Sequence, residues 1–158
     1  MLIARMRAFA LALVLILAAA ANVASAAVPD EINTMELFRV INENRGKVVV
    51  VNFFATWCAP CILEVPGLIE LRKQYPEKDV LLIAVSFDND AEMVAEFMGK
   101  KQINYTVRMG TVDVAEAFQV VGLPKLLLFS KKGALVVNHN GYMTKEELKK
   151  YIDRLLAE

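Results

Sequence analysis

Apolar and polar positions along this chain follow two periods, one typical of amphipathic helices and one typical of buried strands. The last helix has the clearest pattern: Thr144 and Glu147 fit a capping box, and apolar side chains fall on one stripe from residue 148 to residue 156. Near the other end, Asn33 or Thr34 can cap a helix that runs to about residue 44. The pattern therefore predicts an amphipathic helix near each end of the folded part.

Between these two helices, apolar runs rich in Val, Ile and Leu predict further strands. We expect them at residues 48–54, 79–86, 105–108, 125–129 and 134–138. The intervening patterns predict helices at residues 58–74, 91–101 and 113–118, and Pro66 should kink the first of these. In the second, we expect Met93, Val94, Phe97 and Met98 to face inward. Strands and helices in this order predict an α/β fold with a central sheet flanked by helices on both faces.

The first 26 residues have the pattern of an export signal. Arg5 and Arg7 precede an apolar stretch from residue 8 to residue 21, and Ala24-Ser25-Ala26 fits a cleavage site. The stretch has about 14 residues, whereas a helix needs about 20 to span a bilayer. We therefore predict a signal peptide at residues 1–26, with an uncleaved membrane anchor as the alternative, and one domain at residues 27–158. Either outcome predicts a periplasmic protein, soluble or tethered to the inner membrane.

The charge of the exported part argues against one class of partner. Residues 27–158 carry 18 acidic and 16 basic side chains, which leaves a net charge of −2. This balance gives no electrostatic reason to expect a nucleic-acid partner. Exported domains often rely on several disulfides, but this chain has only two cysteines, so its fold depends on a hydrophobic core.

The two cysteines stand together as Cys58-Ala59-Pro60-Cys61, directly after the apolar run at residues 48–54. They should therefore lie where a strand turns into a helix, and a helix amino terminus stabilises a thiolate. This spacing is typical of thiol–disulfide exchange. A bridge that only staples a loop would add little stability, because the loop is short. A zinc site needs about four ligands, and the other strong candidate, His139, is alone and distant. We expect no metal and no cofactor.

Several separate stretches resemble the thioredoxin superfamily, and more narrowly its exported TlpA/ResA-like members, which include the CcmG/DsbE proteins of cytochrome c maturation. The resemblance rests on residues 51–61 (Val-Asn-Phe-Phe-Ala-Thr-Trp-Cys-Ala-Pro-Cys), Glu64 with Pro66, the helical segment between residues 88 and 102, and Val-Gly-Leu-Pro at 121–124. It covers essentially all of residues 27–158. It implies a thioredoxin-like fold, with a central mixed sheet and an extra helical insertion.

The resemblance also assigns roles around the cysteines. It implies that Pro124 follows a cis peptide bond beside them and that the backbone of Leu123 binds an extended substrate peptide. Lys125 comes next, where many relatives have Thr, which bears on substrate preference. We expect Trp57 to shield the disulfide and to form part of the docking surface; the alternative is a core aromatic.

Two polar residues near the motif are candidates for proton transfer. Asn52 stands where cytoplasmic thioredoxins have a buried aspartate, and an amide cannot take up a proton at neutral pH. We expect Asn52 to be buried and satisfied by backbone hydrogen bonds. The resemblance suggests Glu64, three residues after Cys61, as the replacement base. The alternative is a solvated acid favoured near a helix amino terminus.

These features predict an exported thiol–disulfide oxidoreductase in which Cys58 attacks a protein disulfide and Cys61 resolves the mixed disulfide. We expect a reductant, because no basic residue lies in the motif and the next ones are Arg72 and Lys73. Lys125 could change this by reaching the Cys58 thiolate. The resemblance implies a membrane thiol-relay protein as electron donor. We expect protein disulfides as substrates, with apocytochrome c among the candidates, and a monomer.

Alternatives to this function remain open at the level of sequence. One is a thiol oxidase or isomerase of the same fold, and another is a binding module without enzyme activity. A copper chaperone is a third, since Met93, Met98, Met109 and Met143 could be ligands; core packing explains them more simply.

Overall fold

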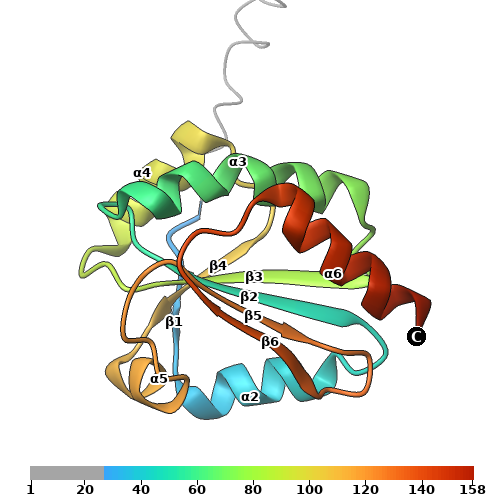
Figure 1. Ribbon diagram of the computed structural model, residues 1–158. Helices are drawn as coiled ribbons and strands as arrows, with labels where there is room; N and C mark the ends of the chain where they lie inside the picture. Colours follow the sequence, from blue (N-terminus) through green and yellow to red (C-terminus); the bar gives the residue numbers. More distant parts are fainter. Residues whose placement is uncertain (1–26) are drawn as a thin grey trace, which may run out of the picture.

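The computed structural model describes residues 27–158, so the predicted signal segment at 1–26 lies outside the described residues (Figure 1). Among residues 27–158, no helix combines the length and the apolar character needed to cross a bilayer. The strands are β1 (Glu31–Ile32), β2 (Val48–Phe54), β3 (Val80–Ser86), β4 (Thr106–Gly110), β5 (Lys125–Phe129) and β6 (Leu135–Asn140). The helices are α2 (Thr34–Glu43), α3 (Ala59–Gln74), α4 (Ala91–Lys101), α5 (Val112–Ala117) and α6 (Lys145–Ala157).

The strands form one mixed sheet in the order β1-β4-β3-β2-β5-β6. The pairs β1–β4, β4–β3 and β3–β2 are parallel, whereas β5 runs antiparallel to both β2 and β6. Helices α3, α4 and α6 cover one face and α2 and α5 cover the other (Figure 1). The predicted α/β fold, with a mixed sheet between two helical layers and α4 as the extra helical segment, is therefore confirmed.

The central strand β2 is buried on both sides, and its side chains alternate between the two helical layers. Val48, Val50 and Phe54 pack in the cluster that includes α3, α4 and α6. Val49, Val51 and Phe53 pack in the cluster that includes α2 and α5. Asn52 lies in register with the first set, so its polar side chain points toward α3. The end of β2 then carries the chain directly into the cysteine motif.

Local sequence features place most of these elements correctly. Both capping boxes are present, Asn33 with Glu36 on α2 and Thr144 with Glu147 on α6. The bounds predicted for β2, α4 and β5 agree with the structure, and the helix predicted at residues 58–74 begins one residue later because Cys58 is its N-cap.

The sequence does not predict one of the strands, and the expectations for β4 and Met93 need correction. The pattern does not predict β1, because two residues are too short to show a period; the pairing of Glu31 with Met109 defines this strand. Strand β4 lies a little later than expected, at Thr106–Gly110. Met93 is half exposed rather than facing inward. Successive side chains point about 100° apart around the axis of a helix. The buried side of α4 is centred on Val94, so Met93 points away from it.

Candidate active site

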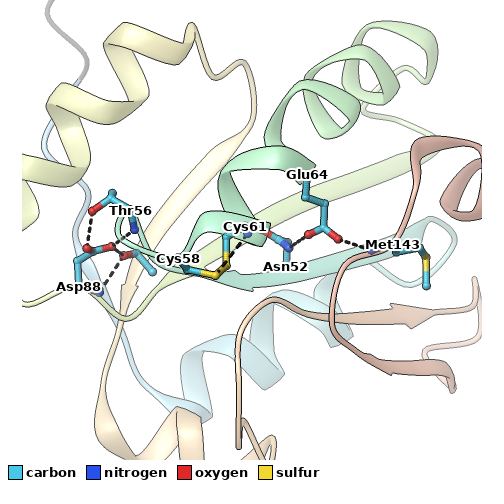
Figure 2. The surroundings of a disulfide bond; sticks show 8 residues. Asn52, Thr56, Cys58, Cys61, Glu64, Asp88 and Met143 are labelled. Carbon is cyan, nitrogen blue, oxygen red and sulfur yellow. Dashed lines mark hydrogen bonds between the residues drawn. A yellow bond between two sulfur atoms is a disulfide. The ribbon is translucent and has the colours of Figure 1, made fainter.

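The two cysteines form a disulfide at the amino terminus of α3, with 5.2 Å between their Cα atoms (Figure 2). Cys58 is the N-cap of this helix, and its Sγ accepts a hydrogen bond from the Cys61 backbone N–H at 3.3 Å. Cys58 is 6% exposed and Cys61 1%. In the dithiol state, a Cys58 thiolate at this position would benefit from the partial positive charge of the helix end.

The turn that leads into Cys58 is fixed by Asp88, a residue that sequence reasoning missed. The Asp88 carboxylate accepts hydrogen bonds from the Thr56 backbone N–H at 2.9 Å and the Thr56 hydroxyl at 2.6 Å (Figure 2). It also accepts one from the Ser86 hydroxyl at 2.6 Å. Asp88 is 32 residues from Thr56 and follows β3, the strand beside β2. No local pattern could have shown this pairing, because only the alignment of β2 and β3 creates it.

An apolar groove of about 690 Å³ lies beside the disulfide. One wall contains residues 57–60, and residues 120–123 line the groove together with Phe87 and Ala115. Trp57 is 70% exposed, so the alternative of a core aromatic is wrong. The Leu123–Pro124 peptide bond is cis, as the resemblance implied. The groove therefore offers an apolar surface next to Cys58, without a charged side chain in its lining.

Glu64 lies on α3 one turn after Cys61 and is only 3% exposed, so the alternative of a solvated acid is wrong. One carboxylate oxygen accepts from the Asn52 side-chain amide at 2.7 Å, and the other accepts from the Met143 backbone N–H at 2.9 Å (Figure 2). The ion pairs among residues 27–158 do not include Glu64. Burial raises the pKa of Glu64 to about 7, and the hydrogen bonds from Met143 and Asn52 offset part of this effect.

Two further observations describe this buried carboxylate. Asn52 is buried as expected, but its amide donates to the Glu64 side chain rather than to the backbone, because both side chains point into the space between β2 and α3. The pKa of Tyr105 is raised, first by burial and then by the negative charge of Glu64. Sequence reasoning missed Tyr105, which lies about 40 residues further along the chain.

Lys125 is buried, and its hydrogen bonds go to groups other than the sulfurs. Its Nζ donates to the Gln119 carbonyl at 3.1 Å and to the Asn140 side-chain oxygen at 3.3 Å. Leu126 on the next position packs toward α3, so Lys125 faces the other side of the sheet, toward α5. The hydrogen bonds recorded for Lys125 thus do not support the suggestion that it holds the Cys58 thiolate. Burial lowers the pKa of Lys125.

The predicted site residues fall into two adjoining groups. Trp57, Cys58 and Leu123 line the groove, with the cis bond between Leu123 and Pro124 at its edge. Cys61 and Glu64 lie on the buried side of α3. Among residues 27–158, no three His, Cys, Asp or Glu side chains converge in a way that could hold a metal ion.

Comparison with known proteins identifies the family. The family model described as Redoxin matches residues 27–155. The chain belongs to the Redoxin family. The thiol-disulfide oxidoreductase ResA of Bacillus thuringiensis subsp. konkukian is 31% identical over 116 residues, which cover 73% of this chain and 67% of that protein. The thioredoxin-like protein YneN of Bacillus subtilis is 28% identical over 116 residues, or 72% of this chain and 68% of YneN.

Solved structures agree with this assignment. The thiol:disulfide interchange protein of the thioredoxin family from Chlorobium tepidum aligns with a TM-score of 0.68 and 25% identity, over 73% of this chain and 83% of that structure. The predicted resemblance to thioredoxin-like thiol–disulfide oxidoreductases is therefore confirmed. This Redoxin-family protein is an enzyme of that class, with its cysteine pair at the strand-to-helix turn.

Proposed function

We propose that this Redoxin-family protein reduces disulfides in periplasmic proteins, using Cys58 and Cys61 as its dithiol. The observation that carries the proposal is the disulfide at the start of α3, which opens onto an apolar groove beside the cis Leu123–Pro124 bond. The groove gives a polypeptide substrate a surface next to the reactive sulfur. We further propose that residues 1–26 export the protein or tether it to the inner membrane, leaving residues 27–158 as the active domain.

The proposed reaction transfers two electrons from the enzyme to its substrate. The Cys58 thiolate attacks one sulfur of a substrate disulfide; that S–S bond breaks, and the departing sulfur takes up a proton. The Cys61 thiol then loses its proton and attacks Cys58 Sγ, which breaks the mixed disulfide and releases the second substrate thiol. The enzyme ends with the Cys58–Cys61 disulfide seen in the structure.

Proton transfer in the second step is the role we assign to Glu64. A carboxyl group with a pKa of about 7 exists in both protonation states near neutral pH and can exchange protons there. It lies one helical turn from Cys61, is buried, and accepts hydrogen bonds from Asn52 and Met143. Removing its charge should make the thiolates easier to form, because a nearby negative charge disfavours them.

The direction of electron flow follows from how weakly the Cys58 thiolate is stabilised. The hydrogen bond recorded to Cys58 Sγ within residues 27–158 comes from a backbone N–H, not from a basic side chain. Lys125 donates elsewhere, and Glu64 adds negative charge when it ionises. A weakly stabilised thiolate favours the disulfide state of the enzyme and therefore makes it a reductant.

A reductant in an oxidising compartment needs an external supply of electrons. We propose a membrane thiol-relay protein as the donor, apocytochrome c as one candidate substrate, and a monomer as the working form. The relatives named ResA support the general chemistry, and the apolar groove supports a polypeptide substrate. A variant with Cys61→Ala should retain substrates as mixed disulfides on Cys58. The Cys58→Ala, Cys61→Ala double variant is the matched control, since it can retain none.

The reduction potential tests the proposed direction. We expect equilibration of the purified protein with dithiothreitol or glutathione buffers to give a value nearer the about −270 mV of thioredoxin than the about −120 mV of DsbA. Insulin reduction should accompany it. A potential above about −180 mV would show an oxidant or isomerase instead.

A further inference from the structure

Lys125 is a charged residue in an unusual place, at the first position of β5 and directly after cis Pro124. Its side chain is only 2% exposed, although lysine is seldom fully buried unless it is paired. The ion pairs recorded among residues 27–158 do not include it. Burying a cation among neutral partners costs free energy. The burial of Lys125 therefore needs an explanation, and the contacts of its ammonium group supply one.

One contact braces the turn where the groove wall begins. Lys125 Nζ donates to the Gln119 carbonyl at 3.1 Å, and the same oxygen accepts from the Val121 backbone N–H at 3.0 Å. Gln119 has a φ of 52°, in the left-handed region that residues with a side chain rarely adopt. The lysine thus stabilises a backbone conformation that is intrinsically unfavourable.

The turn at Gln119 and Lys125 stand at the two ends of the segment that lines the groove. Residues 120–123 line the groove, the wall starts at Gln119 and it ends at cis Pro124 just before Lys125. One side chain therefore ties the end of this segment back to its beginning. Displacement of the turn would move Val121, which is 88% exposed at the groove, and Leu123 with it.

The second contact anchors the same segment to the edge strand of the sheet. Lys125 Nζ donates to the Asn140 side-chain oxygen at 3.3 Å, and these two residues are paired across β5 and β6. The next residue, Gly141, donates its N–H to the Pro124 carbonyl at 2.8 Å. The wall is thus held both at its start and against β6.

We propose that Lys125 is a positioning residue that sets the shape of the apolar groove and so the affinity for protein disulfides flanked by apolar side chains. It does so without acting on the sulfurs, because its side chain faces α5 and its hydrogen bonds go to Gln119 and Asn140. This inference rests on the proposed function, since it assumes that the groove receives a polypeptide disulfide.

The test uses Lys125→Met, which keeps an unbranched apolar stem but removes the terminal ammonium group and its donors. Lys132→Met, at an exposed lysine in the turn between β5 and β6, is the matched control. The reduced proteins are mixed with excess peptide disulfide whose cysteine lies between valine and leucine, and Trp57, the single tryptophan, reports their oxidation by its fluorescence. The concentration dependence separates binding from the limiting rate.

We expect Lys125→Met to raise the half-saturation concentration for the peptide about threefold to tenfold, as the loss of a hydrogen bond implies, with an unchanged limiting rate. Its rate with 2-hydroxyethyl disulfide, which is too small to fill the groove, should equal that of wild type. Asn140→Ala, which removes only the β6 contact, should give a smaller increase. An unchanged half-saturation concentration would overturn the proposal, and so would equal losses with both disulfides, which would place the effect on the sulfurs.

Amide hydrogen exchange gives a second readout that does not depend on activity. In the oxidised protein, Lys125→Met should speed exchange at the Val121 amide, whose acceptor is the braced Gln119 carbonyl, and Lys132→Met should not. Unchanged exchange at Val121 would overturn the brace itself. If wild-type protein reduces neither disulfide, the proposed function fails, while the exchange measurement still decides whether Lys125 braces the wall.

Discussion

The Glu64→Gln substitution tests the buried carboxylate through its effect on the pH dependence of stability. Glu64 has a pKa of about 7 in the folded protein against 4.5 as its ordinary value, because burial disfavours its charged form. Between these two pH values the folded state binds more protons than the unfolded state does. The contribution of Glu64 to stability is therefore fully present below pH 4.5 and is lost as pH rises through about 7.

The size of the effect follows from the pKa difference. Each pKa unit corresponds to about 1.4 kcal/mol, so ionisation of Glu64 should cost the folded state about 3 kcal/mol by pH 8. Glutamine has nearly the same shape and does not ionise, and rotation of the Asn52 amide allows it to accept the hydrogen bond from the new side chain. The stability of Glu64→Gln relative to wild type should therefore increase by about 3 kcal/mol between pH 4 and pH 8.

Urea unfolding of the oxidised protein, followed by far-ultraviolet circular dichroism at several pH values, measures this difference. The oxidised form is suitable because its cysteines are bonded and do not titrate. Glu116→Gln, at an exposed glutamate on α5, is the control and should follow wild type. A difference in the free energy of unfolding between wild type and Glu64→Gln that stays constant from pH 4 to pH 8 would refute the raised pKa.

In the reduced protein, thiolate absorbance should show lower thiol pKa values in Glu64→Gln; an unchanged titration would exclude a role in proton transfer.

Two further predictions concern the start of α3. Limiting alkylation of the reduced protein should label Cys58 before Cys61, because Cys58 is the N-cap and the less buried of the two; preferential labelling of Cys61 would reverse the assigned roles. Asp88→Ala should lower the free energy of unfolding by about 2 to 3 kcal/mol, since three donors lose their acceptor, and Asp88→Asn should lower it less. Equal urea midpoints for Asp88→Ala and wild type would contradict the role of Asp88 in fixing the turn.

Features that depend on neighbouring residues could be predicted well. The capping boxes at Asn33 and Thr144 are local hydrogen-bond patterns, and the bounds of β2 follow from one uninterrupted apolar run. The cysteine pair is equally local, because the two cysteines are three positions apart and a helix begins between them. Features formed by residues only a few positions apart can be recognised in the sequence.

Features that depend on distant residues were decided by the packing of the sheet and its helices. The burial of Glu64 requires Asn52 on β2 and Met143 before α6, which lie 12 and 79 residues away. Asp88 reaches Thr56 only because β3 lies beside β2, and Lys125 is enclosed only because β6 and residue 119 close around it. The same local sequence around a motif is compatible with a polar side chain that is solvated and with one that is buried. The sequence by itself thus determined the reacting groups, whereas the tertiary structure determined their solvation, and with it the pKa of Glu64 and the shape of the groove.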